Sequence, residues 1–344
     1  MKKHYTLLFI TLLLLGQLGL YAQQDPHISL YRYHLNMFNP AVVGSMTQAT
    51  VGMTLRSQWQ GFEGAPETQV VSFATPTKQE RVGLGFQVIN DKTFVENQTL
   101  AFGSFAYLLK LNQDWDLHLG LQAGFNSFRI NAAGLNIYGS DAIDPNLIDH
   151  SSINPNLGVG AYLKHENYYF SLSAPRILNS KRFKSLEGLV TTAADRVHIY
   201  ASGGATFNLN EQWDFVPSFL FRYVNNAPFL NTLNASFVYN KVIDFGVEYN
   251  FQSGLGGTLM IDTFKNISFG YAYITSVHPA LNQFSKGSHE VALRIRLGEE
   301  KTSIPEEEQE EILLEAVGAV NKTKSDRKEK RIGTQNKETK KQRN

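Results

Sequence analysis

Two histidines are the side chains of this sequence that come nearest to a catalytic arrangement. His118 and His198 each lie on the polar register of an alternating segment, and an inward histidine with an inward serine could make a hydrolase inside a barrel. No third residue can be assigned to orient either histidine, and no segment resembles a nucleophile elbow. We therefore interpret both as lining of a lumen, and we expect that the protein is not an enzyme.

Three aspartates in one long polar segment could bind a metal ion. Asp141, Asp144 and Asp149 could hold calcium through carboxylate oxygens, but their spacing does not match an ordered calcium loop. The absence of cysteine excludes disulfides, thiolate metal sites, cysteine nucleophiles and lipid attachment at a cysteine. With 32 basic and 31 acidic residues, nothing suggests binding to nucleic acid. We expect neither a metal nor a cofactor.

The first residues of the chain indicate export. A pair of lysines precedes an apolar stretch from Tyr5 to Leu20, which is the pattern of a secretory signal peptide. We expect cleavage after Ala22, so that residues 1–22 are the signal peptide. A single transmembrane anchor is the alternative, but its fully apolar core, Leu7–Leu15, is too short to span roughly 30 Å of hydrocarbon.

The elements that must position these side chains are predicted by a repeated alternation of apolar and polar residues. Each segment runs for about ten residues, the length that a tilted strand needs to cross a bilayer. The clearest segment alternates Trp115, Leu117, Leu119, Leu121, Ala123 and Phe125 with Asp116, His118, Gly120, Gln122, Gly124 and Asn126. The predicted strands lie near residues 49–59, 68–75, 81–90, 98–109, 115–126, 156–165, 168–174, 196–207, 213–223, 230–239, 242–250, 254–262, 265–274 and 288–297.

This pattern predicts an all-β protein, a transmembrane antiparallel up-and-down β-barrel of about 14 strands over residues 49–298. Residues 23–48 would form an N-terminal segment in the periplasm or the lumen. The long connections, 127–155, 175–195 and 275–287, all follow odd-numbered strands. Because outer-membrane barrels have short periplasmic turns and longer extracellular loops, we expect an integral outer-membrane protein with both termini in the periplasm. A soluble β-sandwich or lipocalin-like barrel is the alternative.

The composition changes abruptly after the last predicted strand. Residues 299–315 hold eight acidic residues and one basic residue, whereas residues 322–344 hold ten basic and three acidic residues. We expect 299–344 to be a charged periplasmic tail, with a short helix at about 305–320 and disorder from Asn321 onward.

Several segments carry a resemblance to a known family. They are Gln24, Asp25, Pro26 and Tyr31; Phe38, Asn39, Pro40, Ala41, Gly44 and Ser45; Arg56, Gln58, Trp59, Gly61, Phe62, Gly64, Ala65 and Pro66; and, near the end, Asn234, Tyr239, Gly246, Tyr249 and 269–273. Together they resemble the opening and closing segments of the PorP/SprF family, over residues 24–297. The resemblance implies an outer-membrane barrel of the Bacteroidetes type IX secretion system. Its implied partners are secretion subunits or a large secreted cell-surface adhesin of the gliding-motility type, and outer-membrane lipid.

The candidates for partner contact are Asn39, Pro40, Arg56, Trp59, Phe62 and Pro66. Asn39 and Pro40 break structure ahead of the first strand, where a structural turn is the interpretation we favour over a lumen plug or periplasmic contact. Trp59 and Phe62 lie in the first external loop, 59–68, where aromatic side chains beside fixed turns suggest a partner surface. An interfacial aromatic belt is the alternative for Trp59.

Two functions from different classes fit the predicted barrel. The first is a secretion-associated barrel whose loops and lumen hold a secreted adhesin or a subunit of the machinery. The second is a passive porin for small solutes, which the glycines and small polar residues on the lumen register allow. The porin predicts conductance in planar bilayers, and the sequence does not show whether the N-terminal segment or the long loops plug the lumen.

Overall fold

The computed structural model describes residues 27–78, 81–131, 150–178, 196–225, 227, 229–251, 253–264, 266–276 and 285–298. The predicted signal peptide, the three loop aspartates Asp141, Asp144 and Asp149, and the predicted tail helix lie outside these residues.

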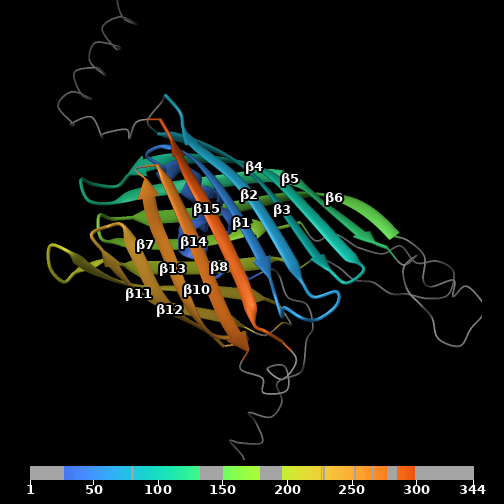
Figure 1. The fold of residues 1–344 in the computed structure, drawn as a ribbon. Helices are drawn as coiled ribbons and strands as arrows, with labels where there is room; N and C mark the ends of the chain where they lie inside the picture. Colours follow the sequence, from blue (N-terminus) through green and yellow to red (C-terminus); the bar gives the residue numbers. More distant parts are fainter. Residues whose placement is uncertain are drawn as a thin grey trace, which may run out of the picture. The chain divides into compact units, whose positions relative to one another are not determined.

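One antiparallel sheet forms the body of the protein (Figure 1). Its strands are β1 Ala49–Ser57, β2 Glu67–Pro76, β3 Val82–Thr93, β4 Glu96–Lys110, β5 Asp116–Ile130, β6 His150–Lys164, β7 Tyr168–Arg176, β8 His198–Ala205, β9 Phe207–Asn208, β10 Trp213–Val224, β11 Leu230–Tyr239, β12 Ile243–Asn250, β13 Gly254–Phe264, β14 Ile267–Ser276 and β15 Ser288–Leu297. The first strand pairs with the last from Ala49↔Leu297 to Ser57↔His289, and this pairing closes the sheet into a barrel. Because β8 and β9 both pair with β10 and only Thr206 separates them, they form one interrupted strand, and the barrel has fourteen strands. The predicted fold is confirmed.

The barrel is apolar on the outside and polar on the inside. On β5 the side chains of Leu119, Leu121 and Phe125 are 44%, 59% and 46% exposed, whereas those of His118 and Gln122 are 3% exposed. A protein folded in water has the opposite distribution, so this exterior suits contact with lipid. Among the described residues no helix is long and apolar enough to span a membrane.

The two ends of the barrel differ in their connections. Consecutive strands at one end, which we call the short-turn end, are joined by 77–81, 111–115, 165–167, 209–212, 240–242 and 265–266. At the other, the long-loop end, the connections include 131–149, 177–197 and 277–287. Three long-loop connections are nevertheless short, Phe94–Val95, 225–229 and Phe251–Ser253. The strands on both sides of the first of these run further than the predicted ones, because hydrogen-bonded pairing continues where the residues are polar on both faces.

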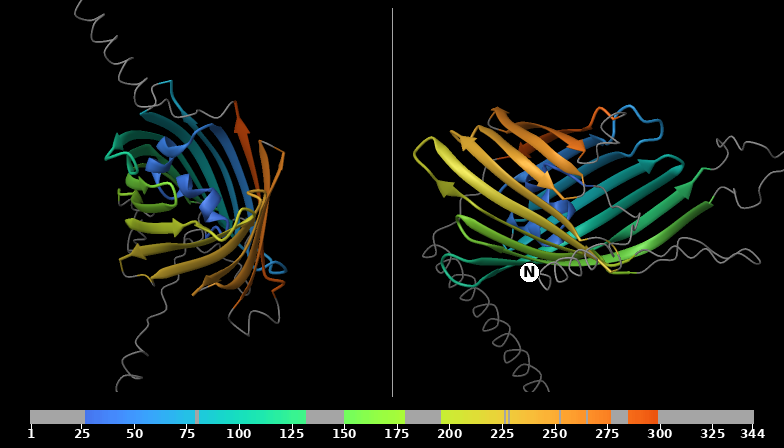
Figure 2. Two further views of the ribbon diagram at one scale, coloured as in Figure 1. Left: turned by 90° about the vertical axis from the view of Figure 1, so that its left-hand side faces the viewer. Right: turned by 90° about the horizontal axis from the view of Figure 1, so that it is seen from below.

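The N-terminal segment lies inside the barrel (Figure 2). It contains three short 3₁₀ helices, η1 Tyr31–Tyr33, η2 Leu35–Met37 and η3 Pro40–Ser45. Ile28, Tyr31 and Ala41 are fully buried between this segment and the inner wall. We call residues 27–45 the lumen plug. The inward residues of the strands are therefore buried against protein, and the exterior is the surface that remains apolar and exposed.

Candidate functional site

Asn39 fixes the second half of the lumen plug to the wall. Its side-chain oxygen accepts a hydrogen bond from the backbone N–H of Ala41 at 2.9 Å, which caps η3 at its start. Its amide nitrogen donates to the backbone oxygen of Ala161 and to the hydroxyl of Ser171, both at 2.8 Å. With 1% of its surface exposed, Asn39 has all its contacts inside the barrel. Its amide thus forms hydrogen bonds with the plug and with two strands, β6 and β7.

Inward glycines let the plug lie directly on the backbone of the wall. A Cβ atom placed on Gly120 would lie 2.2 Å from a backbone nitrogen of η3, and one on Gly83 would lie 2.3 Å from a backbone oxygen of the plug. A Cβ atom on Gly160 would lie 1.9 Å from the side-chain oxygen of Asn39. No real side chain tolerates such distances. These three glycines, on β3, β5 and β6, are therefore part of the plug's binding site.

A buried ion pair fixes the first half of the plug. Arg56 on β1 and Glu290 on β15 are register partners, lie 3.2 Å apart and are 4% and 1% exposed. The Glu290 carboxylate accepts hydrogen bonds from the backbone N–H groups of Ser29 at 2.8 Å and Leu30 at 2.9 Å. A buried carboxylate is stable only with several such partners, and the plug supplies two of them.

Polar contacts also hold the plug to β12. The imidazole of His27 lies 2.8 Å from the carboxylate of Glu248, which is fully buried. Arg32 and the Tyr33 hydroxyl both donate to the carboxylate of Asp244. The plug is thus fixed to β12 as well as to the seam between β1 and β15.

Burial also changes the acidity of groups in the plug. Desolvation, helped by the nearby positive charge of Arg294, lowers the pKa of His34 to about 4. Its Nε2 lies 3.1 Å from the hydroxyl of Thr54 on β1. Desolvation likewise raises the pKa of the Tyr31 hydroxyl above its usual range, and that hydroxyl bonds to Ser218 at 2.9 Å. At neutral pH both groups are therefore uncharged.

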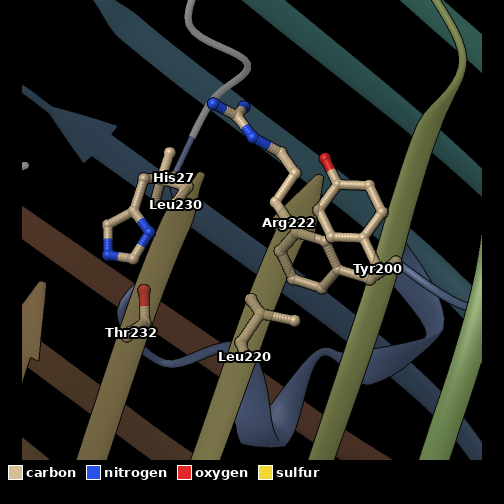
Figure 3. A pocket seen from close by; sticks show the side chains of 7 residues that line it. His27, Tyr200, Leu220, Arg222, Leu230 and Thr232 are labelled. Carbon is tan, nitrogen blue, oxygen red and sulfur yellow. The ribbon is translucent and has the colours of Figure 1, made fainter. Parts of the chain in front are cut away.

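Small cavities lie beside the plug near the long-loop end, and two of them are lined by described residues. One, of about 20 Å³, is lined by His27, Phe38, Tyr200, Leu220, Arg222, Leu230 and Thr232 (Figure 3). The other, of about 30 Å³, is lined by Met37, Phe38, Ile89, Leu100, Phe102, Gln122, Pro175, Arg176 and Tyr200. The rings of Phe38 and Tyr200 lie 5.2 Å apart between them. Such volumes hold one or two water molecules each.

The structure separates the predicted contact residues into two groups. Asn39 and Pro40 belong to the lumen plug rather than to a simple turn, and Arg56 faces the lumen, where its ion pair is internal. Trp59, Phe62 and Pro66 lie in the connection between β1 and β2 at the long-loop end. Only this second group is placed where a partner outside the barrel could reach it.

The β1–β2 connection is ordered by hydrogen bonds to both of its neighbours. The backbone N–H of Gln60 donates to the oxygen of Gly287, and that of Phe94 donates to the oxygen of Gly64. Trp59 and Phe94 have positive φ angles of 51° and 52°, a strained conformation for aromatic residues. Phe62 and Phe94 are 39% and 59% exposed. We call Trp59, Phe62 and Phe94 the aromatic platform.

Neither candidate catalytic histidine has a catalytic arrangement among the described residues. His118 faces η3, and its Nδ1 would lie 2.9 Å from a Cβ atom on Gly44 of the plug. His198 lies 3.3 Å from the guanidinium of Arg176 and stacks on Tyr200, with ring centroids 6.4 Å apart. Both side chains contribute to the lumen wall.

Sequence reasoning missed the carboxylates and glycines that hold the plug. Glu248, Glu290 and Asp244 are buried acidic residues of the lumen wall on β12 and β15, and Gly120 and Gly160 are inward positions on β5 and β6. An acidic residue at an inward position of a strand could have been noticed in the sequence. Its position does not show which residue it pairs with.

The closed barrel, with its apolar exterior and buried polar inner wall, defines an outer-membrane β-barrel protein. Within that class the chain belongs to the family described as type IX secretion system membrane protein PorP/SprF, which it matches over residues 20–295. This match confirms the resemblance seen in the sequence. Among curated proteins none matches the chain.

Solved structures with a similar fold are more distant. A Pseudomonas aeruginosa FadL homologue shares 11% identity over 76% of this chain and 93% of that chain, with a TM-score of 0.43. The CymD monoaromatic hydrocarbon channel shares 11% identity over 77% and 93%, with a TM-score of 0.47. Outer membrane phospholipase A from Escherichia coli shares 10% identity over 75% and 98%, with a TM-score of 0.35. Similarity at this level carries no inference about ligands of this chain.

Proposed function

We propose that this member of the type IX secretion system is a plugged docking barrel, which holds secretion subunits or anchors and delivers a secreted adhesin of the gliding-motility type. The observation that carries the proposal is the lumen plug, because a barrel filled by its own N-terminal segment is better suited to binding than to conduction. Membership of the PorP/SprF family supplies the secretion context.

The orientation follows from the two kinds of connection. We place the short-turn end in the periplasm and the long-loop end outside the cell, as in other outer-membrane barrels. β15 ends at Leu297 on the short-turn side, so the tail after it would begin in the periplasm. There it could meet subunits of the machinery, while the long-loop end would meet the secreted partner.

The aromatic platform is our candidate surface for the secreted partner. Exposed aromatic rings on an ordered backbone contribute large contact area at low entropic cost. Phe62 and Phe94 meet this description, since their backbones are fixed by hydrogen bonds while their rings are exposed. Lipid contact alone does not require strained backbone at Trp59 and Phe94.

Two other functions are less consistent with the geometry. A passive porin needs an open lumen, and here residues 27–45 occupy it. A barrel enzyme needs a nucleophile and an oriented base, and we propose that the protein has no catalytic role, since His118 and His198 contact the plug and other wall residues.

The proposal is tested by affinity isolation of the tagged protein from solubilised outer membranes, with identification of the bound chains. We expect secretion subunits, a secreted adhesin, or both. The double variant Phe62→Ser/Phe94→Ser should lower recovery of the secreted partner several-fold. Leu111→Ser is the matched control, because Leu111 is 56% exposed at the short-turn end. Recovery of neither class of partner would contradict the proposal.

A further inference from the structure

One pair of neighbouring strands in the barrel is unlike all the others. Every other pair consists of strands that follow one another along the chain, whereas β1 and β15 are joined only by their own hydrogen bonds. We call this pairing the seam. Because no connection tethers its two strands, separating them costs no loop strain, and the seam is where the barrel would open first.

The lumen plug binds both strands of the seam at the same point. Glu290 of β15 accepts the backbone N–H groups of Ser29 and Leu30, at 2.8 and 2.9 Å. Arg56 of β1 donates to the Ser29 hydroxyl at 3.1 Å and to Glu290 at 3.2 Å. These four residues therefore form one buried hydrogen-bond network that joins β1, β15 and the plug.

The same stretch of plug continues along the seam toward the short-turn end. The imidazole of His34 bonds to Thr54 of β1 at 3.1 Å. Leu30 packs in one apolar cluster with Met260, Ala272 and Ala292 of β13, β14 and β15. The guanidinium of Arg294 on β15 lies 5.0 Å from the centre of the Tyr33 ring. Residues 29–34 thus contact both strands over several successive inward positions.

We propose that residues 29–34 are an internal clamp that holds the barrel closed at its seam. The clamp supplies a tether that the chain topology lacks, because it is continuous with β1 and is bonded to β15. Without it, Glu290 loses both backbone N–H donors and Arg56 loses the Ser29 hydroxyl, so that β1 and β15 keep only their ladder hydrogen bonds and the single ion pair. Displacing the clamp would therefore loosen the wall sideways at the seam, in addition to emptying the lumen. This inference goes beyond the proposed function and does not depend on it.

Amide hydrogen exchange of the full-length protein in lipid nanodiscs tests the clamp. Ser29→Pro removes one N–H donor to Glu290 and leaves every wall residue unchanged. Glu290→Gln weakens both backbone hydrogen bonds and removes the ion pair. In each variant we expect exchange in β1 and β15 to rise roughly tenfold or more, while exchange across β4 and β5 stays at the wild-type rate. Resistance of unheated protein to SDS verifies that the barrel has formed.

Ser218→Ala is the matched control, since it removes a plug contact, the Tyr31 hydroxyl bond, on β10 and away from the seam. It should leave exchange in β1 and β15 unchanged. An unchanged seam in Ser29→Pro, or an equal rise in all strand pairs, would overturn the clamp. If Glu290→Gln fails to fold, Ser29→Pro alone decides, because its substitution lies outside the wall.

Discussion

At the scale of single residues, buried polar side chains organise the lumen, because each forms hydrogen bonds with protein groups in place of water. Asn39 satisfies three backbone or hydroxyl groups, and Glu290 accepts from two plug amides and one arginine. Each of these groups would be costly to leave unpaired in the interior. A few polar residues therefore fix the position of the plug, and the inward glycines allow its backbone to approach the wall.

Gly120 gives the sharpest residue-scale prediction. Gly120→Ala should displace η3, because the new Cβ atom would lie 2.2 Å from plug backbone, and we expect a loss of about 1–3 kcal/mol in unfolding free energy. Urea unfolding in lipid vesicles measures it. Gly257→Ala is the control, since a Cβ atom there meets nothing within 4 Å. Equal stability of the two variants would contradict the assigned contact.

His34 makes docking of the plug depend on pH. Its pKa is lowered to about 4 in the folded protein and is about 6.5 when exposed, so the undocked state binds more protons between these values. The docked state is fully favoured above pH 6.5 and loses at most about 1.4 kcal/mol per pH unit as the pH falls toward 4. Proteolysis of residues 27–45 at pH 7.5 and pH 5 measures this. In His34→Gln, which lacks this titrating group, the protection of residues 27–45 from proteolysis should fall less between pH 7.5 and pH 5.

At the scale of elements, the strands were predictable, whereas the place of the N-terminal segment was left open between the periplasm and the lumen. Alternation located every strand because lipid selects apolar residues at every second position and the lumen does not. The same rule placed His118 on the inward face, but it does not indicate which inward residues meet which part of the N-terminal segment. Asn39 and Pro40 were identified as a structural break, yet their partners on β6 and β7 depend on how the barrel closes. Contacts between distant segments leave no periodic signal.

Removing the plug should turn the barrel into a pore. A variant lacking residues 27–45 is expected to conduct ions in planar bilayers, whereas the wild-type protein should stay silent, because the inner wall is polar once exposed. Resistance of unheated samples to SDS verifies folding. Conduction by the wild-type protein would favour the passive porin, and a silent deletion variant would show that the plug is not the barrier.

At the scale of the whole molecule, the exterior decides the environment. Leu121→Arg on β5 should destabilise the barrel in lipid by about 2–4 kcal/mol, since it places a charge on a lipid-facing position that is 59% exposed. Urea unfolding in vesicles measures the loss. Leu111→Arg is the control, because Leu111 is equally exposed, at 56%, but lies in a connection at the end of the barrel. Equal effects would argue against a bilayer around β5.

The direction of the N-terminal segment has a consequence for biogenesis. β1 begins at the short-turn end, yet His27 and Ser29 reach Glu248 and Glu290 near the opposite end, so the segment runs the other way along the inside. If the predicted signal peptide held the chain in the inner membrane, the chain would run through the closed barrel, so we expect cleavage before the wall closes around residues 27–45.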